Sequence, residues 1–161
     1  MNTRAIGDLT IRPLRNGDTA TVAAFFARLG DRSRRSRFAG PKPRLSEDEL
    51  ELMARVGRDR HALVAYRTGD PLPVGIAELV RSAADPKSAE IAFAVADEHQ
   101  GRGIGRTLVD LLLADARAAG LTRVTAFVSG SNPAALALVR GAAEVDRMEL
   151  VGSQIELQAA I

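Results

Sequence analysis

One unbroken run of the chain joins an apolar strand pattern, a polar spacer, three alternating glycines and a long amphipathic helix pattern. It spans residues 92–120 and has the sequence AFAVADEHQGRGIGRTLVDLLLADARAAG. Glycines at Gly101, Gly103 and Gly105 leave successive main-chain N–H groups unobstructed, and the start of a long helix carries partial positive charge. The run therefore predicts a strand, loop and helix unit that binds a phosphate group at the helix N-terminus.

Two common phosphate-binding loops do not fit this run. A dinucleotide-binding loop has the spacing G-x-G-x-x-G directly after its strand, but here the third glycine comes one place early, at Gly105, after a four-residue polar spacer. A nucleotide P-loop ends in Lys followed by Ser or Thr, whereas Arg106 and Thr107 stand here. The remaining interpretation is a pyrophosphate held by main-chain N–H groups, with Arg102 and Arg106 adding positive charge.

Alternating periodicities predict the order of elements along the chain. Strands are expected over residues 9–14, 61–67, 73–80, 89–96, 123–129, 145–151 and 153–159. Helices are expected after Asp18 or Thr19, after Ser46, over 106–120 and over 132–140, because each begins or ends with a capping residue. The order β-α-α-β-β-β-α-β-α-β-β predicts one α/β domain over residues 1–161, with a mixed, mostly antiparallel sheet and helices on both faces.

Composition limits the chemistry that the chain can perform. Its 161 residues include no cysteine and two histidines, His61 and His99, so disulfides and a cysteine acyl-enzyme are excluded and no metal site is expected. No apolar run approaches the ~20 residues of a membrane span, and no secretory signal is evident, so no membrane contact and a cytoplasmic location are expected. Chemistry is left to carboxylates, hydroxyls and main-chain groups.

Positive charge is concentrated in residues 28–44, which we interpret as a loop between the first two helices. The net charge of the chain is only +2, yet this segment holds one acid, Asp31, against seven bases: Arg28, Arg32, Arg34, Arg35, Arg37, Lys42 and Arg44. Such a cluster can attract an anionic partner or can simply be a solvated loop. Phe38 is its only ring, which argues against single-stranded nucleic acid.

Residues 100–105, QGRGIG, resemble the coenzyme A pyrophosphate signature Q/R-x-x-G-x-G/A of the GNAT acyltransferase superfamily. Val95 stands near the end of the preceding strand, as in that signature, and a long helix follows. Asn132, with Ala135 three residues later, opens the helix after the next strand, which also matches. The run AEIAFAVADEHQGRGIG is similar to the GNAT domains of bacterial protein-lysine acetyltransferases.

The resemblance implies a GNAT fold with acetyl-CoA as cosubstrate. Its pantetheine arm would pair with the main chain around Ala94 and Val95, where two strands splay apart. A main-chain N–H near Val95 would polarise the thioester carbonyl. The implied coenzyme contacts are Ala94, Val95, Gln100, Gly101, Arg102, Gly103, Ile104, Gly105, Arg106 and Asn132.

The resemblance also implies an N-acetyltransferase in which an amine attacks the thioester directly, in a ternary complex. A lysine-type amine is protonated at neutral pH, so a base is required. Glu90 matches the position of the catalytic glutamate in the protein-acetyltransferase branch, although a carboxylate there can instead be an exposed or ion-paired residue; Glu78 is the second candidate. Val139 replaces the tyrosine that is the family's frequent general acid, and the only tyrosine is Tyr66.

Two other functions stay open, a non-catalytic acyl-CoA-binding regulatory domain and a basic module that binds nucleic acid or ribosomes. The acceptor is a protein lysine or a small-molecule amine, and the coenzyme motif does not distinguish them, because variable loops select the acceptor. If the basic segment borders the acceptor, it predicts acidic groups near the acceptor amine. The chain is expected to be a monomer or a homodimer.

Overall fold

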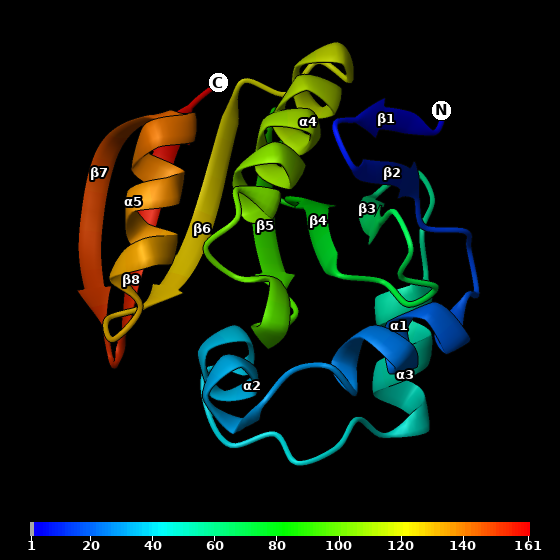
Figure 1. Cartoon of the computed structure of the whole chain (residues 1–161). Coiled ribbons are helices and arrows are strands. Elements are labelled where there is room, and N and C mark those ends of the chain that lie inside the picture. Colours follow the sequence, from blue (N-terminus) through cyan, green and yellow to red (C-terminus); the bar gives the residue numbers. More distant parts are fainter. Residues whose placement is uncertain (1) are drawn as a thin grey trace.

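The computed structural model describes residues 2–161 as an eight-stranded sheet with five α-helices (Figure 1). The strands are β1 (Arg4–Ile6), β2 (Leu9–Pro13), β3 (Arg60–Arg67), β4 (Gly75–Arg81), β5 (Ser88–Val95), β6 (Arg123–Ser129), β7 (Glu144–Val151) and β8 (Gln154–Ala160). The helices are α1 (Thr19–Phe26), α2 (Asp31–Phe38), α3 (Glu47–Ala54), α4 (Ile104–Ala118) and α5 (Pro133–Ala142), with a 3₁₀ turn, η1 (Asp97–His99), before α4.

The strands lie in the order β1-β2-β3-β4-β5-β6-β8-β7, and every neighbouring pair is antiparallel except β5 and β6. On one face of the sheet α4 packs on the central strands and α5 lies beside α4, while α1 and α3 pack on the opposite face (Figure 1). The predicted α/β fold, with a mixed and mostly antiparallel sheet between helices, is confirmed.

The strand β1 and the helix α2 were not predicted. β1 forms a hairpin with β2 through Gly7, whose φ of +59° favours glycine, and its three residues are too few to show a periodicity. The basic segment is also not a loop, because residues 31–38 form α2, which ends at Ala39 in the left-handed region. α2 has no buried residue, so it lacks the apolar stripe by which a helix is predicted from sequence.

Four helix-terminus predictions are confirmed. The Asp18 side chain accepts from the Thr21 N–H at 3.0 Å, and the Asn132 side chain accepts from the Ala135 N–H at 3.1 Å. Ser46 and Glu49 form a reciprocal capping box at the start of α3, and Gly120 follows α4 with φ +83°. Local side-chain chemistry therefore sets these boundaries.

Apolar packing differs between the two faces of the sheet. On the α4 face one continuous cluster joins β2–β6 and β8 to the apolar stripe of α4, which consists of Ile104, Leu108, Val109, Leu112, Leu113 and Ala116. On the face toward α1 and α3 the buried side chains fall into two smaller clusters, one around Val22 and one around Phe25 and Phe26. The α4 face is thus the main core, and the other face is less completely filled.

A polar cluster ties the N-terminal hairpin to α4. The Asp115 carboxylate, in the last turn of α4, is 9% exposed and accepts from Arg4 Nη2 at 2.6 Å. Its other oxygen lies 2.9 Å from His61 Nε2 on β3. Since both partners converge on one carboxylate, Asp115 links β1, β3 and α4.

We predict that Asp115→Ala lowers the free energy of unfolding by about 2 kcal/mol, because it leaves partly buried groups of Arg4 and His61 without their partner. Urea denaturation followed by circular dichroism measures the change. Glu149→Ala is the control: it removes a surface ion pair with Arg147, in which both side chains are more than half exposed, and should change stability little. Equal losses in the two variants would contradict the structural role of Asp115.

Candidate active site

The parallel strands β5 and β6 pair only along their first halves. Ser88 to Ile91 lie opposite Arg123 to Ala126, and the pairing stops there. Both strands continue beyond this point, to Val95 and Ser129 respectively. The last residues of β5 therefore have a main-chain edge without a strand partner, in the gap where β5 and β6 diverge (Figure 1).

The main-chain groups that face this gap belong to Phe93 and Val95. The Ala96 N–H donates to Val74 O at 2.8 Å, on the β4 side, and Lys87 O accepts from the Thr122 N–H on the β6 side. Because main-chain direction alternates along a strand, odd-numbered residues of β5 point toward β6 and even-numbered ones toward β4. Val95 and Phe93 therefore turn their main-chain groups to the gap, whereas the main chain of Ala94, which was also expected there, faces β4.

The glycine loop lies directly beyond β5 and has the geometry of an anion site. Gly101 and Gly103 have φ values of +75° and +82°, and a Cβ on either would meet no atom within 4 Å. Gly103 is the N-cap of α4 and supplies no side-chain hydrogen bond. The first bond into the helix runs from the Thr107 N–H to Gly103 O, so the N–H groups of residues 104–106 have no acceptor within the helix.

Gly105 holds this loop against the end of β5. It is buried, and a Cβ would lie 3.1 Å from Leu138 Cδ1 of α5 and 3.5 Å from Val95 Cγ2. A side chain at this position would press on Leu138 and touch Val95. The glycine therefore sets the short distance between the loop and the gap, a packing role that its place in the motif does not reveal.

The two arginines of the loop differ. Arg106 pairs with Asp110 at 2.9 Å and donates to Gly141 O at 2.9 Å, so its charge is already engaged and only its main chain faces the anion site. Arg102 is exposed and forms no ion pair within residues 2–161. Of the two arginines expected to add positive charge at the loop, only Arg102 has a side chain without an ion-pair partner in residues 2–161.

Helix α2 crosses the open end of the gap and contacts both strands. Gln100 Nε2 donates to Val95 O and to Ser33 Oγ, each at 3.0 Å. On the other side Asn132 Nδ2 donates to Ser36 Oγ at 3.0 Å. The structure thus brings Gln100 and Asn132 to the two sides of one gap, joined by serines that no sequence motif marked.

A second unpredicted cluster fixes the segment before the loop. Arg28 pairs with Asp70 at 2.8 Å, and its Nη2 lies 3.2 Å from His99 Nε2 in η1. The Asp97 N–H, also in η1, donates to Arg28 O. Arg28 therefore holds η1, and with it the start of the glycine loop, against the end of α1.

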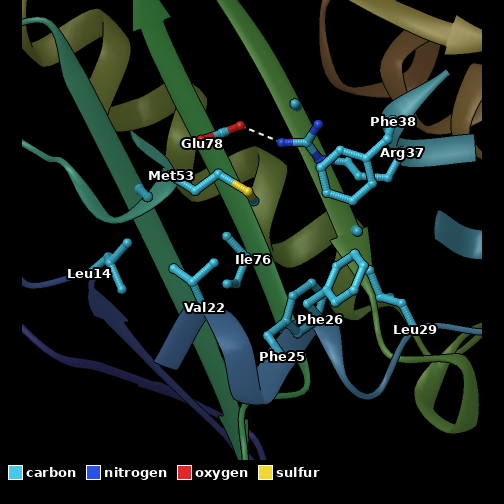
Figure 2. A pocket seen from close by; sticks show the side chains of 13 residues that line it. Leu14, Val22, Phe25, Phe26, Leu29, Arg37, Phe38, Met53, Ile76 and Glu78 are labelled. Atoms are coloured by element: carbon cyan, nitrogen blue, oxygen red, sulfur yellow. Dashed lines mark hydrogen bonds and ion pairs between the residues drawn. The ribbon is translucent and has the colours of Figure 1, made fainter. Parts of the chain in front are cut away.

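The two candidate carboxylates lie on the face of the sheet toward α1–α3, in different states. Glu78 is buried and binds the guanidinium group of Arg37 on α2 (Figure 2). Its other oxygen lies 3.2 Å from the guanidinium group of Arg60 on β3. Both of its oxygens are occupied, so it acts as an ion-pair partner that fastens α2 to the sheet. Its two ion pairs make Glu78 less available than Glu90 to accept a proton.

Glu90 is the free carboxylate on that face. It shares the face with Glu78, whose cross-strand partner is Ala92, two residues further along β5. Although Glu90 reaches solvent, the surrounding protein desolvates its carboxyl and raises the pKa above the ordinary value of 4.5, an effect that Arg37 opposes and Glu78 reinforces. A raised pKa suits a general base that works near neutral pH.

Comparison with known proteins identifies this architecture. Residues 26–142 match the acetyltransferase (GNAT) family. The chain belongs to the GNAT acetyltransferase family. The GNAT domain of S. lividans PAT is 26% identical, with a TM-score of 0.86 over 99% of this chain and 94% of that one.

Two further structures share the fold. Spermidine N-acetyltransferase from Vibrio cholerae, in complex with CoA and spermine, is 24% identical with a TM-score of 0.69, over 97% of this chain and 96% of that one. A mutant of the cAMP-binding acyltransferase from Mycobacterium smegmatis is 24% identical with a TM-score of 0.64; it covers 99% of this chain, which spans 46% of that protein.

This GNAT acetyltransferase lacks a tyrosine at the expected general-acid position. Val139 is buried in α5, and the Tyr66 hydroxyl accepts from Arg12 Nη2 at 2.8 Å on a different strand. Within residues 2–161 no cluster of His, Asp or Glu could hold a metal ion, and no helix has the length and apolar character needed to cross a membrane.

We predict that Gly103→Asp abolishes CoA binding measured by calorimetry, because a carboxylate enters the anion site and its Cβ occupies the open side of the loop. Gly152→Asp is the matched control: Gly152 also has positive φ and open surroundings, in the turn between β7 and β8, so it carries the same backbone strain without the charge at the loop. Circular dichroism should show both variants folded. Unchanged CoA affinity in folded Gly103→Asp would remove the anion site from the loop.

Proposed function

We propose that this chain is an acetyl-CoA-dependent N-acetyltransferase in which an amine acceptor attacks the thioester directly. The observation that carries the proposal is the unpaired edge of β5 at Phe93 and Val95, continuous with the glycine loop at one end and with Glu90 on the same strand. One element thus offers main-chain donors for an extended arm, leads to an anion site for a pyrophosphate, and presents a base.

Each residue has a distinct part in this proposal. N–H groups of residues 101–106 bind the pyrophosphate, together with Arg102. The main chain of Phe93 and Val95 pairs with the pantetheine arm, and the Val95 N–H is the donor to the thioester oxygen. Gln100 and Asn132 shape the two sides of the gap, Gln100 through Val95 O and Asn132 as the cap of α5.

Acetyl-CoA supplies an acetyl thioester, from which the acceptor nitrogen takes the acetyl carbon as the bond to sulfur breaks. An amine must lose a proton in this exchange, and Glu90, directly or through a water, receives it. With Val139 at the tyrosine position, solvent is left to protonate the CoA thiolate. Direct attack by the amine needs no covalent intermediate on the chain. A thioester intermediate on cysteine is also excluded, because the sequence has no cysteine.

A non-catalytic acyl-CoA-binding domain is the alternative function. It would need the loop and the gap but not a free carboxylate with a raised pKa, so the state of Glu90 favours catalysis. Incubation of acetyl-CoA with a panel of polyamines, amino acids and lysine peptides, read as release of free CoA, separates the two. Acetyl-CoA binding without turnover on any acceptor would favour the regulatory domain.

We predict that Glu90→Gln leaves acetyl-CoA affinity unchanged and lowers kcat/KM for the acceptor by ~100-fold or more, the usual contribution of a general base. The deficit should shrink as pH rises, because the acceptor then loses its proton without help. In the wild type Glu90 must be ionised to act, so activity should fall as pH drops through its raised pKa, and this fall should lie above pH 4.5.

Glu144→Gln, at an exposed position of β7, is the control and should keep wild-type activity. If Glu90→Gln turned over a genuine acceptor at the wild-type rate, solvent and not Glu90 would be the proton acceptor.

The structure also shows which basic residues of segment 28–44 could attract an acidic acceptor. Four of the seven basic residues in segment 28–44 already have partners within the fold: Arg28 with Asp70, Arg34 with Phe26 O and Pro43 O, Arg37 with Glu78, and Lys42 with Glu49. The other three, Arg32, Arg35 and Arg44, are exposed and form no ion pair within residues 2–161. These three are the groups that can attract acidic groups beside an acceptor amine.

We predict that replacing Arg32, Arg35 and Arg44 together with Gln raises the acceptor KM several-fold and flattens its dependence on salt, because the attraction of exposed charges is screened within ~10 Å at 0.1 M. The acetyl-CoA KM should stay nearly constant. Lys87→Gln with Arg117→Gln, both exposed and outside segment 28–44, is the control. Loss of coenzyme affinity in the triple variant would instead assign these arginines to a CoA phosphate.

A further inference from the structure

An apolar cavity lies where the packing between the sheet and α1–α3 is incomplete (Figure 2). It separates the cluster around Val22 from the cluster around Phe25 and Phe26. Its volume is about 20 Å³, enough for one water-sized group. The α4 face, by contrast, is packed as one continuous cluster.

The cavity adjoins the proposed thioester position. The side chains of Ala92 and Ala94, on β5, line the cavity. The neighbouring residues Phe93 and Val95 turn their main-chain groups to the gap. The cavity is therefore one side-chain layer away from the edge that would hold the pantetheine arm. Phe38 and Arg37 of α2 also line it, and α2 contacts both β5 and β6.

The lining excludes an amine as the occupant. Arg37 and Glu78 are its only charged residues, and they bind each other, with Arg60 on the second Glu78 oxygen. A cationic acceptor would find no free carboxylate there, and burial of an unpaired ammonium group is strongly unfavourable. An uncharged hydrocarbon group faces no such cost, and gains free energy in proportion to the apolar area it buries.

We propose that this cavity receives the end of the acyl chain and that the enzyme accepts a three-carbon acyl thioester, propionyl-CoA, at least as well as acetyl-CoA. This rests on the proposed coenzyme site, since the cavity matters only if a thioester lies along β5. In this proposal the acetyl methyl lies beside Ala92 and Ala94, and one further carbon enters the cavity. A fourth carbon exceeds the volume, because the surrounding side chains are close-packed.

The test is the affinity of the full chain for CoA, acetyl-CoA, propionyl-CoA and butyryl-CoA, measured by isothermal titration calorimetry without an acceptor. Propionyl-CoA should bind about fourfold more tightly than acetyl-CoA, the effect of burying one methylene, and butyryl-CoA more weakly than propionyl-CoA. Ala92→Val adds two carbons to the cavity wall and should bring the propionyl advantage to one or below, with CoA affinity unchanged.

Val22→Ile fills the same cavity from α1 and should have the same effect, so the test does not depend on one variant folding. Ala114→Val, at an exposed site on α4, is the control and should keep the wild-type order of affinities. Tenfold weaker binding of propionyl-CoA than of acetyl-CoA by the wild type, or an unchanged ratio in both cavity variants, would overturn the inference and leave the acetyltransferase proposal intact. If CoA and all three thioesters fail to bind, the proposed coenzyme site itself is wrong.

Discussion

The site depends on one structural constraint, the end of β5 and β6 pairing after Ile91 and Ala126. Buried main-chain N–H and C=O groups are costly without partners, and the divergence leaves those of Phe93 and Val95 facing a gap inside the sheet. Val95 O is satisfied by Gln100, whereas the N–H groups face the gap. Gly105 brings α4 close enough that the same gap leads to the uncapped start of that helix. This arrangement suits an extended ligand with an anionic end: the extended part would lie in the gap and the anionic end at the start of α4.

The two faces of the sheet divide stability from chemistry. The α4 face carries the continuous core, which is one large cluster of buried side chains with partly buried ones packed against it. The face toward α1–α3 holds Glu90, the ion-paired Glu78 and the apolar cavity, and its packing is broken into two clusters. Helix α2 has no buried residue, and its apolar contact with the core is made by Phe38, which packs on Phe26. Its polar contacts include Ser33 to Gln100, Ser36 to Asn132 and Arg37 to Glu78. Such a helix can cover the gap without being part of the folded core.

The features that could be predicted from the sequence are those with a local pattern. The strands of the core, the caps at Asp18, Ser46 and Asn132, and the glycine loop all have local patterns, and the fold class followed from their order. α2 was predicted as a loop because it has no buried face and most of its contacts are hydrogen bonds and ion pairs to residues more than 40 positions away, which no local pattern records. For the same reason the sequence named Glu78 as a candidate base without showing that two arginines hold it, and chose Ala94 where the strand register selects Phe93.

Amide hydrogen exchange by NMR, with and without acetyl-CoA, tests the central claim most directly. If the coenzyme arm pairs with the free edge of β5, the N–H groups of Phe93 and Val95 gain protection, as do those of the loop at residues 103–106. The N–H groups of Ala92 and Ala94, which face β4, should stay as protected as before. Protection of the loop alone, or of neither segment at saturating acetyl-CoA, would contradict a coenzyme site in the gap between β5 and β6.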